Sequence, residues 1–147
     1  MGVKVTFEIE GDKEVSMELG IEADKISKWT EPLEKIDTEL LYSIDQNFSS
    51  SGALFDDAGA WVERKGDYPW PILEKTGNMR GNFHSQVFND YLVIKNPTEY
   101  FKYHQSNKPR KALPRRVMMK IDSIRRTFII KKFQEYIVET TRKLKKR

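Results

Sequence analysis

The first twenty residues alternate between hydrophobic and polar side chains. The hydrophobic positions form two runs on either side of Gly11-Asp12, which are Val3, Val5, Phe7 and Ile9 and then Val15, Met17 and Leu19. A period of two is typical of a strand with one buried face, and Gly-Asp favours a turn. The pattern predicts a β-rich start over residues 1–20, arranged as a hairpin.

Two longer segments have the spacing of amphipathic helices. The first covers residues 31–47, with Thr30 as its expected N-cap and a hydrophobic face formed by Leu33, Ile36, Leu40 and Ile44. The second covers residues 118–144, and its expected hydrophobic stripe is Ile121, Ile124, Phe128, Ile130, Phe133, Ile137 and Leu144. This stripe shifts after Phe128, which indicates either a bend or two packing partners.

Shorter elements are expected between the two helices. Residues 71–76 fit one helical turn that ends at Gly77, and residues 83–88 and 91–94 alternate like two strands joined at Asn89-Asp90. Asn96 is the expected N-cap of a short helix that ends near Gln105. The order of elements predicts an α+β fold, in which a small antiparallel sheet packs against an N-terminal amphipathic helix and a long C-terminal helix.

Residues 49–70 interrupt this order with a long segment that has no sustained periodicity. Connections longer than about 12–15 residues are uncommon inside compact domains and are often functional. The segment also carries large apolar side chains that a flexible linker would not need, namely Leu54, Phe55, Trp61, Tyr68 and Trp70. We interpret residues 49–70 as an arm that packs on its own domain or on a neighbouring chain. These five side chains are therefore candidate interface residues.

The charge of the chain is distributed unevenly along a length that suits one domain over residues 1–147. Residues 1–48 carry five Lys or Arg and twelve Asp or Glu, whereas residues 102–147 carry sixteen and three. Five of the cations are concentrated in a basic segment and are further candidate interface residues, at Lys108, Arg110, Lys111, Arg115 and Arg116. The acidic and basic ends can pair within one fold or between neighbouring subunits, or the basic end can face nucleic acid.

Residue types that carry catalysis occur here without the partners they need. The chain has no Cys, and its two histidines, His84 and His104, lack the spacing of metal ligands. Phosphate-binding loops and nucleophile elbows are also missing from the sequence. We expect a non-enzymatic protein with no catalytic, cofactor or metal site. Because residues 1–10 lack a signal-peptide pattern and no apolar run is long enough to span a bilayer, we expect synthesis in the cytoplasm and no membrane partner.

From Trp29 onward, short motifs follow one another in a recognisable order. They are Trp29-Thr30-Glu31-Pro32-Leu33, Gly59-Ala60-Trp61, Ile72-Leu73-x-x-Thr76-Gly77-x-Met79-Arg80, Tyr100 with His104-Gln105, and Leu113-Pro114-Arg115-Arg116-x-Met118. Their order and spacing resemble the phage virion morphogenesis family, the tail-completion proteins of Mu-like and P2-like phages. The resemblance covers residues 29–144 and departs from the family at Phe101, Ser106 and the Arg116-Val117 pair.

The resemblance implies a structural role in a phage particle. Proteins of this family form rings, commonly hexamers, at the tail end or in the neck that joins the tail to the capsid. Their expected partners are further copies of the chain, other neck or tail proteins such as a connector, tail terminator or tube, and non-specifically the genomic DNA. It also marks Gly77, Arg80, His104, Gln105 and Pro114 as structural motif residues. A small basic nucleic-acid-binding protein is the alternative that the C-terminal charge leaves open.

Overall fold

The computed structural model describes residues 28–55, 60–105 and 114–146. Its elements are α2 (Thr30–Ser49), α3 (Asn78–Gly81), β1 (His84–Val87), β2 (Leu92–Lys95), α4 (Phe101–Gln105) and α5 (Ser123–Lys145). Two long helices accompany a small antiparallel sheet, so the predicted α+β class is confirmed. The β-rich start predicted for residues 1–20 lies outside the described residues.

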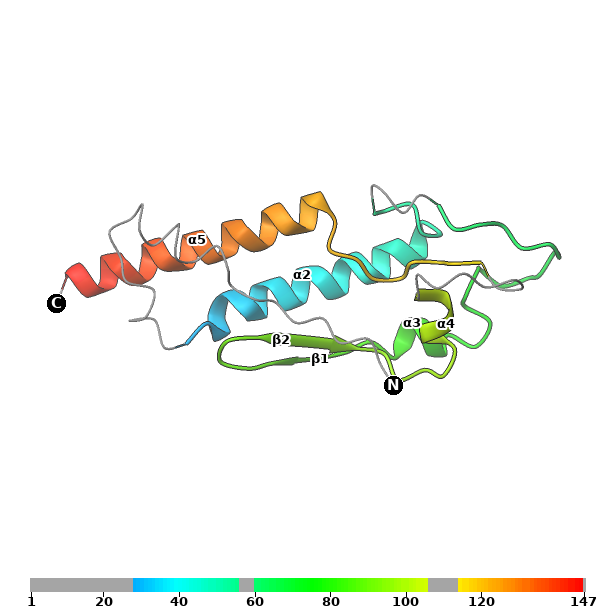
Figure 1. Cartoon of the computed structure of the whole chain (residues 1–147), viewed down its shortest axis with the longest axis horizontal. Helices are drawn as coiled ribbons and strands as arrows, with labels where there is room; N and C mark the ends of the chain where they lie inside the picture. The colour runs from blue at the N-terminus through cyan, green and yellow to red at the C-terminus, as the bar shows by residue number, and fades with distance from the viewer. Residues whose placement is uncertain (1–27, 56–59, 106–113, 147) are drawn as a thin grey trace.

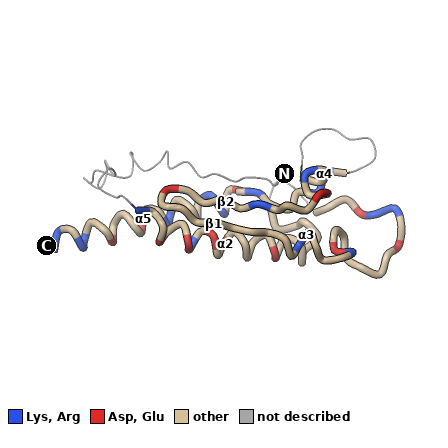
Figure 2. The backbone as a smooth tube through the Cα atoms, turned by 90° about the horizontal axis from the view of Figure 1, so that it is seen from below, with Lys and Arg blue, Asp and Glu red and all other residues tan. Residues whose placement is uncertain are grey.

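The described part of the chain is elongated, and α2 forms its middle layer. Helices α2 and α5 run antiparallel along the long axis, and the β1–β2 hairpin lies on the other side of α2 (Figure 1). Seen from below, the hairpin follows the same axis (Figure 2). Since α2 contacts both other layers, its hydrophobic residues must serve two interfaces.

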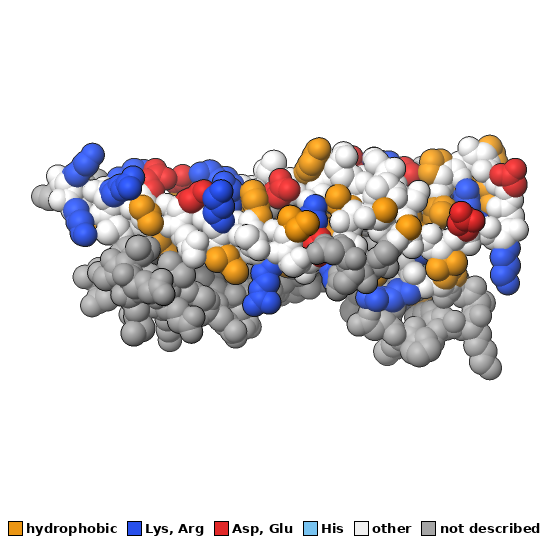
Figure 3. Space-filling view, turned by 90° about the horizontal axis from the view of Figure 1, so that it is seen from above, with side chains coloured by type: hydrophobic (Ala, Val, Ile, Leu, Met, Phe, Trp, Pro, Cys, Tyr) orange, Lys and Arg blue, Asp and Glu red, His pale blue; other side chains and the backbone are white. Residues whose placement is uncertain are grey.

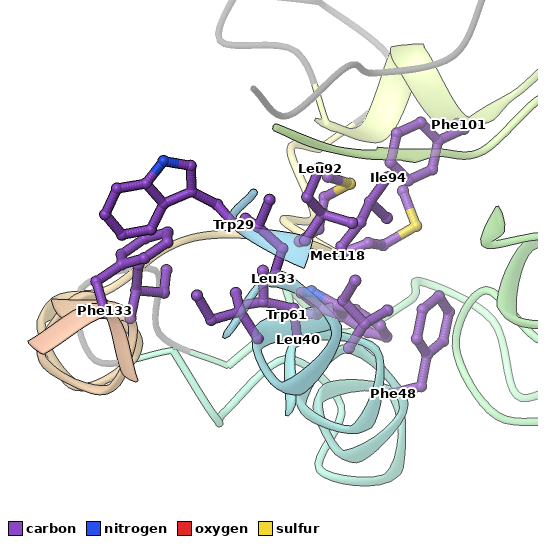
Figure 4. Packing of buried hydrophobic residues seen from close by; sticks show 14 of the residues in the cluster. Trp29, Leu33, Leu40, Phe48, Trp61, Leu92, Ile94, Phe101, Met118 and Phe133 are labelled. Carbon is purple, nitrogen blue, oxygen red and sulfur yellow. The ribbon is translucent and has the colours of Figure 1, made fainter. Parts of the chain in front are cut away.

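Helix α2 buries the side chains that its spacing predicted. Leu33, Ile36, Leu40 and Ile44 are all buried, and their contacts extend to the hairpin residues Leu92 and Ile94 and to α5 (Figure 4). The periodicity of three and four therefore located this helix correctly, to within two residues at each end.

The expected cap at Thr30 was wrong. Trp29 occupies the N-cap position, Thr30 is the first helical residue, and no side chain caps α2 in the described structure. Trp29 is held instead by packing, because its indole meets Phe133 of α5 edge-on at 5.7 Å between ring centroids. Its backbone N–H donates to Asn89 O at the hairpin turn over 2.7 Å. The entrance to α2 is thus fixed by tertiary contacts that the local sequence does not contain.

Helix α5 begins later than predicted. It starts at Ser123, where Asp122 caps it by accepting a hydrogen bond from the Arg125 backbone N–H over 2.9 Å. The residues buried along it are Arg125, Ile129, Phe133 and Ile137, at a constant spacing of four. Ile124, Ile130 and Leu144 were assigned to the stripe but are exposed. One continuous stripe explains the burial without the predicted shift.

A buried ion pair takes the place of a hydrophobic residue at the start of that stripe. Arg125 Nη1 donates to Asp122 Oδ2 over 2.6 Å, and Arg125 Nε donates to Ser43 Oγ on α2 over 3.2 Å. Breaking such a pair from one side strands a buried charge, which typically costs about 3–5 kcal/mol. The pair joins the first turn of α5 to α2.

The predicted hairpin is confirmed, and its register explains which residues are buried. Strand β1 pairs antiparallel with β2, with Ser85 opposite Ile94 and Val87 opposite Leu92. These four side chains share the face that lies against α2, and Ser85 Oγ donates to Asp37 Oδ2 of α2 over 2.9 Å.

Two short elements differ from their predictions. Residues 71–76 form no helix, and Gly77 lies before α3 with a φ of 73° instead of ending a helix. Asn96 does not cap α4, which begins only at Phe101. Its Oδ1 accepts the Thr98 backbone N–H over 3.0 Å, while its Nδ2 donates to Met79 O over 2.7 Å. Asn96 therefore fastens the loop before α4 to α3.

Candidate interaction site

The segment before α5 is clamped by side chains from three distant parts of the chain. Gln105 Nε2 donates to Met119 O over 2.7 Å, and its Oε1 accepts the backbone N–H groups of Met118 and Met119 at 2.8 and 3.2 Å. Asn47 Nδ2 and Trp61 Nε1 both donate to Val117 O, at 3.0 and 2.9 Å. These hydrogen bonds satisfy the buried backbone N–H and C=O groups of residues 117–119 and hold this segment outside α5.

Trp61 and Phe55 of the arm belong to the core of their own domain. Trp61 is 6% exposed and packs edge-on against Phe48, and Phe55 is 1% exposed with the Arg125 guanidinium 5.5 Å from its ring centre. Both were candidate interface residues, and their burial removes them from that set. The sequence correctly marked them as anchored, but the anchor is internal. Leu54 beside them is partly buried.

Arg80, a residue of the recognised motif, joins α3 to the C-terminal end of α2. Its Nε donates to Asp45 Oδ1 over 2.8 Å, its Nη1 to Glu74 Oε1 over 2.7 Å and its Nη2 to Ser49 Oγ over 2.8 Å. The guanidinium holds the pKa of the Asp45 carboxyl below its ordinary value, and hydrogen bonds to both carboxylates raise the pKa of Arg80. A cation here also suits the negative end of the α2 dipole.

His104 of α4 is hydrogen-bonded to the backbone of Pro114. His104 is buried, and burial followed by the charge of Arg116 lowers its pKa, although a hydrogen bond with the Pro114 backbone opposes the shift. The His104 carbonyl accepts the Arg116 backbone N–H over 2.9 Å. His104 thus acts as a neutral packing residue that ties α4 to the returning chain.

The outer part of the arm extends past the C-terminal end of α2 (Figure 1). Its rings of Tyr68 and Trp70 stack with centroids 5.2 Å apart, and Tyr68 is 49% exposed. The Arg64 guanidinium lies 5.2 Å from the Tyr68 ring centre, and Lys75 Nζ lies 5.3 Å from that of Trp70. A stacked aromatic pair is therefore flanked by a cation on each side, on a surface that is at least partly exposed.

A pocket of about 360 Å³ opens beside this surface, and we call it the arm pocket. Its walls come from the arm, residues 72–76, α3, the loop before α4 and the basic segment. They are Arg64, Trp70, Ile72, Leu73, Lys75, Thr76, Asn78, Met79, Thr98, Tyr100 and Arg116. Three cations and no Asp or Glu occur among these described lining residues. Leu73 has a φ of 64°, a strained value for a branched residue that is more common at functional sites. The pocket is thus positively charged.

Arg116 is the most buried cation of the arm pocket. It is 7% exposed, and its Nε and Nη2 donate to Val62 O of the arm over 3.2 and 2.8 Å. Burial, and then repulsion by Arg64, lower the pKa of Arg116. Arg64 itself donates from Nη2 to Trp70 O over 2.7 Å. Arg64 and Arg116 thus line the same pocket, each held by a backbone carbonyl, and their like charges favour an anion as the ligand.

The arm pocket joins the two groups of candidate interface residues that the sequence kept apart. Trp70 comes from the arm and Arg116 from the basic segment, while Tyr68 stacks at the margin and Arg115 is exposed. Lys108, Arg110 and Lys111 lie outside the described residues. The sequence did not indicate Arg64 or Lys75, because no local pattern shows that either side chain faces Arg116.

A second hollow of the described chain lies on the β1–β2 hairpin. The outer face of the hairpin forms a groove of about 340 Å³ beside the stacked rings of Phe88 and Tyr91. Within residues 28–55, 60–105 and 114–146, no three His, Cys, Asp or Glu residues are grouped closely enough to hold a metal ion. None of the described helices is both long and apolar enough to cross a membrane.

Comparisons with known proteins returned no relative. No protein-family model, no curated protein and no solved structure matches this chain.

Proposed function

We propose that this chain is a structural virion protein of a tailed phage. It acts in tail completion or head–tail joining, as a ring subunit at the neck or tail end. The observation that carries the proposal is the arm pocket, where the aromatic arm and the basic segment meet at one end of an elongated subunit. The resemblance in motif order supplies the biological setting.

A closed ring requires each subunit to present two different and complementary surfaces. The arm pocket offers a positive surface with aromatic neighbours, and aromatic and Arg side chains often dominate interface energies. Residues 1–48 carry an excess of seven negative charges, which can supply the complementary surface. The basic lining of the pocket and the acidic N-terminal third of the chain are therefore two different surfaces of opposite charge, as a head-to-tail contact requires.

The residues of the recognised motifs support the proposal through their positions. Arg80 fixes α3 to α2, and Gln105 and Trp61 fix the segment before α5. Both α3 and Arg116 of that segment contribute to the lining of the arm pocket. In this arrangement the motif residues build a rigid support, and the exposed outer arm provides the contact with a neighbour. A rigid support reduces the ordering cost of assembly.

Self-assembly of the purified full chain tests the proposal. We expect sedimentation velocity to show concentration-dependent formation of one discrete oligomer, and negative-stain electron microscopy to show closed rings, six-membered if the resemblance holds. A chain that stays monomeric at every concentration, and is also absent from purified particles, contradicts the proposal.

A nucleic-acid-binding protein is the second candidate function, favoured by the stacked Tyr68–Trp70 pair beside Arg64 and Lys75. Lys and Arg side chains also gather toward the C-terminal end of α5 (Figure 3). However, α5 interleaves them with acidic residues in ion pairs such as Lys143–Glu139, at 2.9 Å. This function predicts strong retention on DNA with a steep salt dependence, and absence of retention at low salt excludes it.

A further inference from the structure

We infer that the arm pocket binds carboxylate side chains from the acidic N-terminal segment of a second copy of this chain. The inference rests on the proposed function, because it names the contact that joins one ring subunit to the next. The acidic segment comprises residues 1–27, which lie outside the described structure and carry seven Asp or Glu and three Lys.

The geometry of the arm pocket favours carboxylates. Arg64 and Arg116 are each fixed by a backbone carbonyl, of Trp70 and Val62 respectively, so their guanidinium groups are positioned before a ligand arrives. A fixed guanidinium binds a carboxylate through strong, charge-assisted hydrogen bonds. Lys75 lies at the exposed margin, where it adds a third positive charge.

The pocket also has room for a side chain with its carboxylate, and not only for a small ion. Its volume of about 360 Å³ is bounded by Ile72, Leu73 and Met79 as well as by the cations. Apolar walls can contact the methylene groups of Glu while the guanidinium groups bind its oxygens. Apolar walls with a few polar groups are typical of specific sites.

The opposite charges of the acidic segment and the arm pocket favour a second copy of the chain as the source of the carboxylates. The acidic segment ends at the N-terminal end of α2, and the arm pocket lies near its C-terminal end. A helix of twenty residues is about 30 Å long. A contact between the acidic segment of one copy and the arm pocket of the next uses two different parts of each subunit. Such a heterologous contact generates a ring when its rotation closes.

Zero-length cross-linking of the full chain tests the inference directly. Unlabelled and ¹⁵N-labelled chains are mixed, allowed to exchange, treated with a carbodiimide that joins Lys to carboxylates, and analysed by mass spectrometry. We expect Lys75 to join acidic residues of residues 1–27, with the two peptides carrying different isotopic labels. Cross-links confined to one label would place the acidic segment in its own subunit's pocket and overturn the inference.

A pair of matched variants measures the energetic effect. Lys75→Glu reverses the charge at the margin of the pocket, and we expect it to weaken self-association at least about tenfold. Lys65→Glu makes the same charge change on an exposed arm residue that does not line the pocket, and it should leave self-association within about twofold of wild type. Equal effects of the two variants would overturn the inference.

The same measurements separate this inference from the proposed function. A wild-type chain that never self-associates contradicts both. If the wild type forms rings but Lys75 makes no cross-links between chains and Lys75→Glu assembles normally, only the inference fails. If Lys75→Glu lowers retention on DNA without changing assembly, the arm pocket serves nucleic acid and the inference is overturned.

Discussion

Gly52 provides the sharpest test of how the arm is anchored. It follows α2 with a φ of 85°, and an added Cβ would lie 2.2 Å from Trp61 Cδ1. In contrast, Gly77 has a φ of 73° with nothing within 4 Å of an added Cβ, and Gly81 has neither a positive φ nor a close neighbour. Three Gly→Ala variants therefore separate backbone strain from the loss of Trp61 packing.

The expected free energies of unfolding differ in a defined order. Gly81→Ala should be neutral or stabilising by up to about 1 kcal/mol, because Ala favours helix. Gly77→Ala should cost about 1–2 kcal/mol for a left-handed backbone alone. Gly52→Ala should cost about 3–5 kcal/mol, since it also displaces Trp61, and loss of a buried Trp side chain typically costs that much. Urea denaturation followed by far-ultraviolet circular dichroism measures all three.

A double-mutant cycle isolates the contact. In a Trp61→Ala background, Gly52→Ala should cost only the backbone strain of about 1–2 kcal/mol, so the two substitutions couple strongly. If Gly52→Ala costs no more than Gly77→Ala in the wild-type background, the proposed packing of Trp61 over Gly52 is wrong. Additivity of the two substitutions would refute it as well.

Three further predictions concern the clamp and the motif residues. Gln105→Ala should lower the free energy of unfolding by about 2–4 kcal/mol, because it strands buried backbone groups of residues 118–119; a cost below about 1 kcal/mol by urea denaturation would contradict the clamp. Burial lowers the pKa of His104 below 6.5, so the unfolded chain binds more protons and stability should fall as the pH drops below about 6.5. In denaturation midpoints at pH 7.5 and 5.5, His104→Gln should reduce this loss, whereas His84→Gln, at an exposed position, should not. Arg80→Gln should cost about 1–3 kcal/mol and reduce the cooperativity of unfolding around the arm, as hydrogen exchange would show; unchanged protection there would contradict the role of Arg80.

The sequence predicted the elements that a local pattern of hydrophobic and polar residues marks. Helix α2 and the hairpin follow from hydrophobic spacing and from Asn89-Asp90, and the structure has both within one or two residues. The start of α5 was missed because Val117 and its neighbours are held outside the helix by Asn47, Trp61 and Gln105. Those partners lie up to 70 residues away, so no local pattern could show them.

The sequence predicted several residues of the candidate site, but it did not predict that the arm and the basic segment meet in one pocket. Aromatic content correctly marked the arm as anchored, yet it could not distinguish Trp61, buried in its own core, from exposed Tyr68. Basic composition marked Arg116 as a candidate interface residue, although its side chain is buried and bonded to Val62 O. Arg64 was missed because only the tertiary structure brings it into the same pocket as Arg116. In all three examples, contacts between segments that are distant in the sequence determine where the side chain lies.

The copy number of this protein in purified particles tests the proposed structural role most directly. For the proposed tailed phage, quantitative mass spectrometry of its particles, with a major capsid protein of known copy number as the reference, gives copies per particle. The proposed ring predicts a small fixed number, six if the resemblance holds, that stays constant after high-salt washing. Absence from complete particles, or a variable amount that is lost with the wash, would contradict a role as a ring subunit of the neck or tail end.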